Sequence, residues 1–395
     1  MLRRYVKNYD YVLLTIIILL SLFGLLMVYS ASMVVATGQK YQGTSELFFL
    51  QQAKWMIIGL GILFFIINVP YQFWNQTKLL FICIILLAIS LLLLFIVGTT
   101  TNNAQSWFRI FGFNVQPSEI VKVIIILYLA SVISKKQAYI NHLTRSILPL
   151  LVPAFILVIL IFKQPDAGTA LIISAVVGII ILCSGISLKN VIYISMTAAV
   201  FVFLAFLSLS ENQMSRIHAM IDPFADVTGG TYQLINGFQA ISLGGFSGLG
   251  FGQSIQKYGY LPEPHTDFIL AIISEELGFF GVFFVLACLF TIIARALVVA
   301  RQCKDNFGSL LALGIAALLS IQTFINVGGL LGLIPLTGVT LPLVSYGGTS
   351  YVTLIFLLAI LVNISTQVRM EKAGVSFTKK EETFKRKGNV TYLES

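Results

Sequence analysis

Long apolar runs alternate with short polar segments along most of this chain. A helix needs about 20 apolar residues to cross about 30 Å of hydrocarbon. Runs of this kind predict about ten membrane-spanning helices, at residues 11–31, 53–69, 78–98, 117–134, 147–163, 168–186, 189–209, 267–294, 308–332 and 343–367. A membrane β-barrel would instead show short segments of alternating polarity. The pattern therefore predicts an all-α polytopic membrane protein.

The composition supports a lipid-facing surface. Of the 395 residues, 57% are hydrophobic and 10% are charged, whereas soluble domains carry about 25% charged residues. The net charge is +9, but most Lys and Arg residues lie at the ends of the apolar runs, which is typical of topology signals rather than of nucleic-acid binding. Three of the four cysteines lie inside apolar runs, so we expect neither a disulfide nor a cysteine metal site.

The placement of the basic residues predicts the orientation of the chain. With the N-terminus inside, 18 Lys and Arg residues fall in inner segments and six in outer segments, while Lys122 lies within a span. Positive residues concentrate on the cytoplasmic side, so both termini are predicted to be cytoplasmic. The first apolar run is long and has no convincing cleavage site, and we interpret it as a span rather than a signal peptide.

This topology makes residues 210–266 a large extracytoplasmic loop between the seventh and eighth helices. Loops of this length are usually functional or disordered, and the aromatic and aliphatic residues of this one argue against disorder. Its glycine-rich stretch 244–252 needs backbone freedom or close approach. We expect a ten-helix membrane domain at residues 1–367 and a flexible basic cytoplasmic tail at 368–395.

Glu119 and Lys122 are ionisable residues near the start of a predicted span, where charge is costly and usually functional. Their three-residue spacing places both on one helix face, and Pro117 suits the first turn of that helix. One interpretation is an interfacial pair whose side chains extend to water. The other is a functional pair that faces a polar cavity, because Lys122 lies one turn too deep in the membrane to be stable without such a cavity.

Two other segments interrupt the apolar pattern. Lys163–Thr169 contains Asp166 and has residues typical of an ordinary turn, so a turn and a ligand site both stay open. Residues 333–350 follow Asn326 and are rich in Pro, Gly, Ser and Thr. Irregular backbone at membrane depth must be buried in protein or line a cavity, and this segment is predicted to do one of the two.

Asp267 stands at the beginning of the eighth predicted span. Thr266 or Asp267 could simply cap that helix. However, Glu263 and His265 crowd the same entry point, below the glycine-rich stretch, which favours a functional carboxylate. Glu276, about two to three turns deeper, is expected to face protein rather than lipid.

These segments together resemble the SEDS family of bacterial envelope proteins (shape, elongation, division and sporulation), which includes FtsW and RodA. The resemblance rests on motifs in the family's order, namely Ala104–Arg109, Gln116–Glu119, Gln164–Asp166 with Gly168–Thr169, Tyr260–Glu263, His265–Ile269 and Ser345–Gly348. Residues 254–263 and the Glu275–Glu276 step are more similar to the FtsW branch than to RodA. The SEDS fold has ten helices, in agreement with the count above.

The resemblance implies a peptidoglycan glycosyltransferase of the bacterial cytoplasmic membrane that acts at the division septum. Such an enzyme polymerises lipid II at the outer face and releases undecaprenyl pyrophosphate. The family's essential acidic residue in the large outer loop maps onto Asp267, which we expect to deprotonate the 4-hydroxyl of the acceptor sugar. The family's charged pair maps onto Glu119 and Lys122, which complete the set of catalytic candidates.

Other residues are expected to bind the substrate. Lys122 could hold Asp267 ionised or neutralise pyrophosphate, and the outer cations Arg109, Arg216 and Lys257 are available for the same anion. The remaining candidates come from the matching motifs: Trp107, Gln116, Ser118, Asp166, His265, Thr266, Ser345 and Tyr346. A divalent cation, Mg²⁺ or Mn²⁺, could bridge Asp267 and pyrophosphate, but the sequence fixes no metal site and requires no cofactor.

The resemblance also implies a class B penicillin-binding protein, a transpeptidase, as a partner, together with other membrane proteins of the division machinery. Three alternatives stay open: a lipid II flippase, a scaffold that only recruits the transpeptidase, and an elongation or sporulation paralogue. The ionisable residues collect at the outer end rather than across the membrane, and we find no convincing internal repeat of the kind common in transporters. Both observations favour the enzyme over the flippase.

Overall fold

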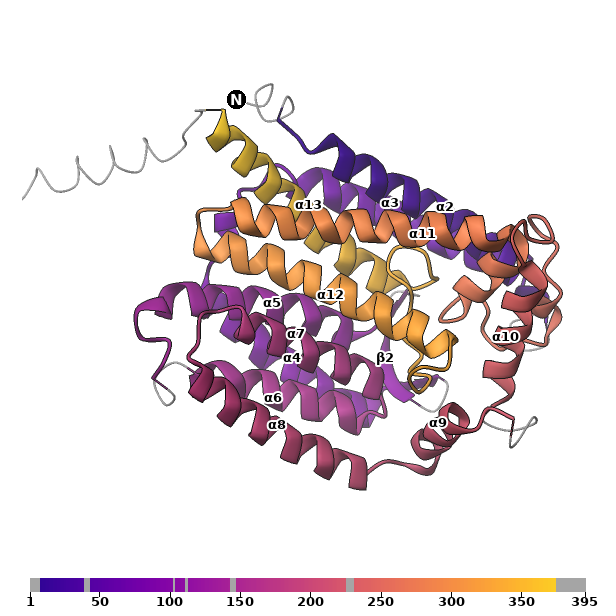
Figure 1. Ribbon diagram of the computed structural model, residues 1–395, viewed down its shortest axis with the longest axis horizontal. Coiled ribbons are helices and arrows are strands. Elements are labelled where there is room, and N and C mark those ends of the chain that lie inside the picture. The colour runs from indigo at the N-terminus through magenta and orange to yellow at the C-terminus, as the bar shows by residue number, and fades with distance from the viewer. Residues whose placement is uncertain are drawn as a thin grey trace, which may run out of the picture.

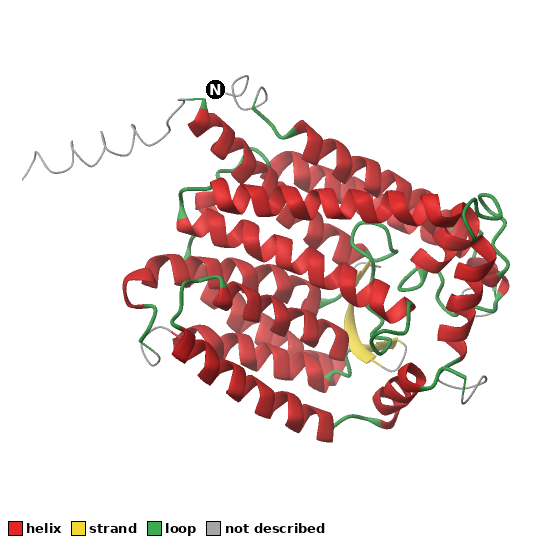
Figure 2. Cartoon of the chain, viewed as in Figure 1, coloured by secondary structure: helices red, strands yellow, loops and turns green. Residues whose placement is uncertain are grey.

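The computed structural model describes residues 8–38, 43–101, 104–110, 113–142, 147–224 and 231–373. Long helices lie side by side and form most of the molecule (Figures 1 and 2). They are α2 (Tyr11–Thr37), α3 (Leu47–Ile66), α4 (Thr77–Val97), α5 (Pro117–Lys136), α6 (Leu148–Lys163), α7 (Ala167–Leu182), α8 (Leu188–Leu207), α11 (Ile269–Gln302), α12 (Asn306–Leu330) and α13 (Gly348–Lys372). Each predicted span overlaps one of them, and the predicted all-α membrane class is confirmed.

The number of spans stays a prediction. Within the described ranges, seven helices are long and apolar enough to cross a membrane. Helices α6 and α7 are also apolar but have 16 residues each, and α8 is a further apolar helix. Of the predicted cytoplasmic tail, residues 368–372 continue α13, and residues 374–395 lie outside the described residues.

Two helix starts differ from the prediction because distant contacts decide them. Helix α3 begins at Leu47 rather than at residue 53, since Gln52 is buried and accepts a hydrogen bond from the Gly347 N–H at 3.3 Å. Helix α13 begins at Gly348 rather than at residue 343. The five residues before it belong to an irregular loop, although their apolar character resembles that of a span.

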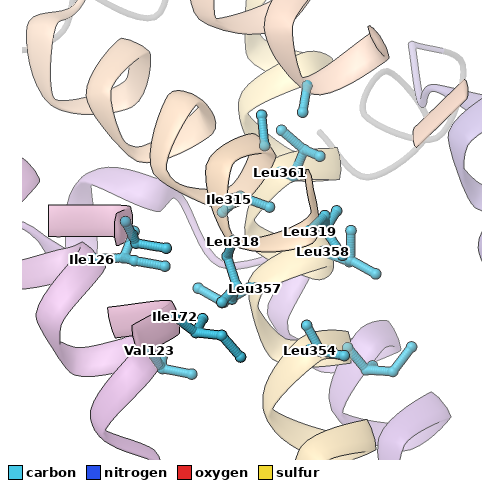
Figure 3. Packing of buried hydrophobic residues seen from close by; sticks show 14 of the residues in the cluster. Val123, Ile126, Ile172, Ile315, Leu318, Leu319, Leu354, Leu357, Leu358 and Leu361 are labelled. Carbon is cyan, nitrogen blue, oxygen red and sulfur yellow. The ribbon is translucent and has the colours of Figure 1, made fainter. Parts of the chain in front are cut away.

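The buried core lies where α5, α7, α12 and α13 meet (Figure 3). Ile126, Ile172, Leu318 and Leu357 come from these four helices and belong to one cluster of buried side chains. Elsewhere large apolar side chains face outward, as in α8, where Val202 is 69% exposed. A helix that is apolar on all sides is a core helix or a membrane span, so the outward side chains are placed for lipid.

A small sheet, which the apolar pattern did not predict, precedes α5. Strands β1 (Thr99–Thr101), β2 (Ala104–Ile110) and β3 (Phe113–Val115) pair antiparallel in the order β1–β2–β3. Thr349 Oγ1, at the start of α13, accepts a hydrogen bond from the Gln116 N–H at 3.3 Å and donates to the Asn114 carbonyl oxygen at 3.0 Å. The sheet is therefore attached to the beginnings of both α5 and α13.

The loop at residues 210–266 is structured where it is described. It contains α9 (Glu211–Ile221), α10 (Tyr232–Gly244) and the 3₁₀ turn η4 (Gln256–Tyr258), and α10 packs against α11. A Cβ atom at Gly244 would lie 1.8 Å from the Ser274 carbonyl oxygen. The glycine-rich stretch therefore makes the expected close approach, and the element it contacts is α11.

Helix α11 is interrupted at Gly278, whose φ of 65° is left-handed. The carbonyl oxygens of Glu275 and Glu276 accept hydrogen bonds from the N–H groups of Leu249 and Gly250, each at 2.9 Å. Both glutamate side chains are fully buried, which confirms the prediction that Glu276 faces protein. The glycine-rich stretch therefore satisfies the backbone groups that the interruption leaves open.

Asp10 connects the beginning of α2 to the ends of α11 and α13. Its Oδ1 lies 2.6 Å from Arg295 Nη2 and 2.9 Å from Arg369 Nη2, and the same oxygen caps α2 by accepting a hydrogen bond from the Leu13 N–H at 3.3 Å. The beginning of α2 and the end of α13 lie at the same end of the molecule (Figure 1). The chain therefore crosses the bundle an even number of times, and the basic residues alone predict which end is cytoplasmic.

Replacement of this aspartate tests its stabilising role. In Asp10→Ala, two arginines lose their buried partner and α2 loses its cap. Because each arginine is about a third exposed, at 32% and 38%, we expect a loss of about 2–3 kcal/mol rather than the full cost of breaking a buried pair. Thermal unfolding in detergent should show a melting temperature several degrees lower. Lys189→Ala, a change at an exposed cation in an inner segment, serves as control, and equal melting temperatures for the two variants would contradict the assignment.

Candidate active site

The first turns of α5 hold Glu119 and Lys122, called the charged pair below. Lys122 Nζ lies 2.7 Å from Glu119 Oε2, and the two residues are 4% and 6% exposed. The interpretation of an interfacial pair that extends to water is therefore wrong. An ion pair shielded in this way needs further polar partners nearby to offset its desolvation.

Asp166 supplies part of that polar surrounding and links α5 to α7. Its Oδ1 accepts a hydrogen bond from the Thr169 N–H at 3.1 Å and caps α7, as an ordinary turn residue would. Its Oδ2 accepts hydrogen bonds from Gln116 Nε2 at 3.1 Å and Ser118 Oγ at 3.3 Å. Burial raises the pKa of Asp166, partly offset by the Thr169 hydrogen bonds, and both charges of the charged pair act on it. Besides capping α7, Asp166 therefore forms one group of interacting charges with Glu119 and Lys122.

Asp267 lies in the turn before α11. The helix begins at Ile269 without a side-chain cap, so the helix-cap interpretation of Asp267 and Thr266 is wrong. Thr266 Oγ1 lies 3.0 Å from Asp267 Oδ1 and 2.8 Å from the Glu263 carbonyl oxygen. Glu263 itself has a φ of 49°, a left-handed conformation that costs a non-glycine residue energy and is typical of functional turns.

Asn326 on α12 holds the Asp267 turn in place, a role that sequence reasoning missed. Its Nδ2 donates hydrogen bonds to the carbonyl oxygens of Asp267 and Val339, each at 2.8 Å. The loop after α12 therefore runs beside Asp267, and a Cβ atom added to Gly338 would lie 4.0 Å from Asp267 Oδ2. The signal available in the sequence was a lone amide at membrane depth just before a Pro- and Gly-rich segment.

The surroundings of Asp267 change its affinity for a proton. Burial raises its pKa to about 6, although the hydrogen bond from Thr266 lowers it. The negative charge of Glu263 raises the pKa further, while Arg216 on α9 lowers it. A carboxylate with such a pKa is mostly ionised at neutral pH and still basic enough to accept a proton from a reacting group.

His265, Ser345 and Tyr346 pack the Asp267 turn against its neighbours. The buried His265 ring lies 4.3 Å from the ring centre of Phe48 and 5.4 Å from that of Tyr346. Tyr346 donates its N–H to the His265 carbonyl oxygen at 2.9 Å, and its hydroxyl donates to Gln51 Oε1. Ser345 Oγ accepts the Leu341 N–H at 2.8 Å. These three residues therefore join the Asp267 turn to α3 and to the loop before α13.

Lys257 lies apart from Asp267 in this structure. It is fully buried, and its Nζ lies 2.7 Å from the Gly252 carbonyl oxygen, 3.0 Å from Glu276 Oε1 and 3.3 Å from Ser30 Oγ. An ammonium group has three N–H donors, so these partners occupy all of them. The prediction that Lys257 binds pyrophosphate as an outer cation needs an accessible ammonium group. In the structure the buried Lys257 side chain instead links η4, α11 and α2.

Trp107 and Arg109 lie on β2, with Trp107 half-buried and Arg109 exposed. On the same strand, Ser106 Oγ donates to the Gln164 carbonyl oxygen at 3.4 Å, so β2 reaches the turn that carries Asp166. Among the predicted outer cations, Arg216 is the one whose charge lowers the pKa of Asp267. Its Nη1 donates to the Leu336 carbonyl oxygen at 3.1 Å.

The loop at 337–339 approaches both the Asp166 turn and Asp267. A Cβ atom at Gly168, next to the Asp166 turn, would lie 2.9 Å from the Thr337 carbonyl oxygen, while Gly338 passes Asp267. Beside this loop is an apolar groove of about 590 Å³ between α7, α9 and α12, with Leu171, Ala175, Ile321 and Phe324 among its lining residues. Arg216 is the one charged residue that lines the groove within the described chain.

The described residues contain no group of three His, Cys, Asp or Glu side chains that could hold a metal ion. A divalent cation beside Asp267 would therefore take its other oxygen ligands from groups such as water and a bound substrate. Phosphate oxygens are suitable ligands, because Mg²⁺ is commonly held by one or two carboxylates together with substrate phosphates.

Stability measurements can test the charged pair independently of any activity. Lys122→Met leaves the Glu119 carboxylate buried without its cation, which should cost about 3–5 kcal/mol and lower the melting temperature. Adding Glu119→Gln removes the stranded charge, so the double variant should regain much of the lost stability. A double variant no more stable than the single one would show that the two side chains do not form an energetic unit.

Comparison with known proteins supports a single assignment for nearly the whole chain. The family model FTSW_RODA_SPOVE, described as "Cell cycle protein", matches residues 10–370. The probable peptidoglycan glycosyltransferase FtsW of Bacillus subtilis (strain 168) is 46% identical over 378 residues, which cover 93% of each chain. Stage V sporulation protein E of the same organism is 36% identical over 362 residues, covering 91% of this chain and 98% of that protein.

A solved structure shows the same fold. It is described as "Structural coordination of polymerization and crosslinking by a peptidoglycan synthase complex", and its matching chain has a TM-score of 0.74 and 24% identity. The match covers 91% of this chain and 98% of the other.

Proposed function

The chain belongs to the FtsW/RodA/SpoVE family, and we propose that it is a peptidoglycan glycosyltransferase that polymerises lipid II at the outer face of the cytoplasmic membrane. The printed name of the Bacillus subtilis relative, 46% identical over 93% of this chain, supports this activity. The same relative is an FtsW, which supports a role in septal wall synthesis during cell division. The identity to the sporulation relative is lower, at 36%.

The observation that carries the proposal is the sequence of environments beside Asp267. The first is the Asp267 carboxylate, with a pKa of about 6. The second is the Arg216 cation, which lowers that pKa, and the third is the apolar groove that Arg216 also lines. A polyprenyl-linked sugar has the matching order of parts: a sugar, a pyrophosphate and a long apolar chain. The groove could hold the first part of that chain, with the remainder in the bilayer.

The proposed reaction needs one base and one anion stabiliser. Asp267 accepts the proton of the acceptor's 4-hydroxyl while that oxygen bonds to the anomeric carbon of the donor. The bond between this carbon and the pyrophosphate oxygen breaks, and undecaprenyl pyrophosphate leaves with the bonding electron pair. Arg216 is placed to stabilise the negative charge that develops there. A divalent cation held between Asp267 and the phosphates would add to that stabilisation.

The charged pair and Asp166 have a supporting role in this proposal. The 337–339 loop contacts the Asp166 turn at Gly168 and passes Asp267 at Gly338, and Lys122 is bound to Glu119. The proposed mechanism needs no direct bond from Lys122 to Asp267. The group fixes the starts of α5 and α7, and with them the wall against which the loop packs.

A partner for cross-linking completes the proposal. The description of the structural relative couples polymerisation to crosslinking in one complex, which supports association of this chain with a class B penicillin-binding protein. The relevant transpeptidation chemistry would then belong to the partner, and both proteins would work at the septum.

The role of Asp267 can be tested with purified protein, its transpeptidase partner and lipid II. Asp267→Ala should lower polymerisation by about 10²–10⁴-fold, the usual range for a lost general base, while folding and partner binding stay intact. The wild-type rate should rise with pH through about 6, because the base must be ionised to act. Glu211→Gln, at an exposed acid on α9, is the matched control.

Normal polymerisation by a folded, partner-bound Asp267→Ala variant would overturn the assignment of the base. Transfer of lipid II across liposome membranes without any glycan product would instead support the flippase alternative.

The groove can be tested by filling it. Ala175→Phe places an aromatic ring in the groove and should raise KM for lipid II with its full prenyl chain more than for an analogue with a short chain. Ala199→Phe, on the exposed face of α8, is the control. An equal effect of Ala175→Phe on both substrates would show that the groove does not hold the prenyl chain.

A further inference from the structure

A second hollow, distant from Asp267, lies between the start of α4 and the end of α5. It has a volume of about 720 Å³ and is lined by nine residues, among them Thr77, Phe81, Tyr128 and Lys135. Helix α5 has 20 residues, so its last turn lies about 24 Å from its first, where the charged pair stands. The hollow is therefore at the end of the molecule opposite the candidate active site.

Contacts with neighbouring helices place the hollow at the end where the chain termini lie. The turn before α4 donates hydrogen bonds to α13: the Tyr71 N–H donates to Asn363 Oδ1 at 3.0 Å, and Gln72 Nε2 donates to Gln367 Oε1 at 2.8 Å. Arg369, which binds Asp10, is on the same part of α13. By the predicted topology, this end faces the cytoplasm.

The charge of the hollow is positive. Lys78, Lys135 and Lys136 are three of its nine lining residues, and no carboxylate is among the nine. Lys135 Nζ donates to the Asn75 carbonyl oxygen at 2.9 Å and to Thr77 Oγ1 at 2.8 Å. One of its three N–H donors is left for a ligand, while Lys78 is exposed. A phosphate group would meet complementary charge here.

The beginning of α4 adds to this positive potential. No side chain caps the helix at Gln76, and Thr77, Lys78 and Leu79 in its first turn line the hollow. The first N–H groups of a helix have no partner within the helix, and the helix dipole favours an anion beside them.

The remaining walls are apolar and suit a lipid rather than a free anion. Leu79, Phe81, Tyr128 and Val132 line the hollow, and Leu79 and Phe81 are 50% and 45% exposed. A ligand that satisfies both surfaces has a phosphate attached to a hydrocarbon chain. Basic pockets between membrane helices on the cytoplasmic side bind anionic lipid headgroups in other proteins for the same reason.

We propose that this hollow binds an anionic phospholipid of the inner leaflet, with the headgroup phosphate between the three lysines and an acyl chain along the apolar wall of α4 and α5. The bound lipid bridges the two helices at the end where Lys135 already joins them. A zwitterionic lipid would fit less well, because its own cation repels the lysines.

Native mass spectrometry of the purified full chain can test the site. With phosphatidylglycerol added, the wild type should retain one lipid more than Lys78→Gln/Lys136→Gln, a variant that keeps the structural hydrogen bonds of Lys135. If each lysine contributes the usual amount near a phosphate, affinity should fall about 30-fold. Lys189→Gln/Lys304→Gln removes two exposed cations outside the hollow and should retain lipid as the wild type does.

Two further measurements distinguish an anionic-lipid site from a general affinity for lipids and from a site for free phosphate. Phosphatidylcholine should be retained poorly by the wild type, and inorganic phosphate should not displace phosphatidylglycerol at equal concentration. Equal retention of phosphatidylglycerol by the two double variants, equal retention of the two lipids by the wild type, or displacement by phosphate would each overturn the proposal. Melting temperatures of both double variants close to that of the wild type confirm that the comparison concerns folded protein.

Discussion

A helix interrupted inside a membrane protein must satisfy its open backbone groups from within the protein, because lipid offers no hydrogen bonds. Helix α11 meets this requirement with the glycine-rich stretch 244–250. That stretch donates N–H groups to the carbonyl oxygens of Glu275 and Glu276, and it accepts the N–H of Phe279 at 3.0 Å. A Cβ atom at Gly248 would lie 2.2 Å from the Glu276 carbonyl oxygen, so the approach depends on glycine. The outer loop is fixed to the bundle at this point.

Buried charge completes the attachment and extends it toward Asp267. The Glu276 carboxylate binds Lys257 and the Ser30 hydroxyl of α2, and Glu275 accepts the Ile255 N–H at 2.8 Å. The part of α11 that carries Asp267 at its entrance is thereby held from two sides. Asn326 then fixes the Asp267 turn to the loop after α12. The carboxylate at the centre of the proposed reaction is positioned by backbone contacts far more than by its own side-chain bonds.

The sequence predicted features that depend on local pattern, and it missed those that depend on distant contacts. Apolar runs located the long helices, and helical spacing paired Glu119 with Lys122. The position of Lys257 in the outer loop predicts an outer cation available to an anion, because sequence position says nothing about burial. The strand β2 was missed since three short strands leave no apolar run. Asn326 gave only a weak signal, because its importance lies in which two carbonyl groups it reaches.

The bond network of Asp10 has a consequence for how the protein is made. Asp10 enters the membrane with the first helix, but its partner Ser365 is 355 residues later, and Arg295 and Arg369 also follow late in the chain. At usual translation speeds, roughly 20–70 s pass between them. During that interval Asp10 lacks part of its final set of partners. The contacts at this end of the bundle are therefore completed only when α13 has been made.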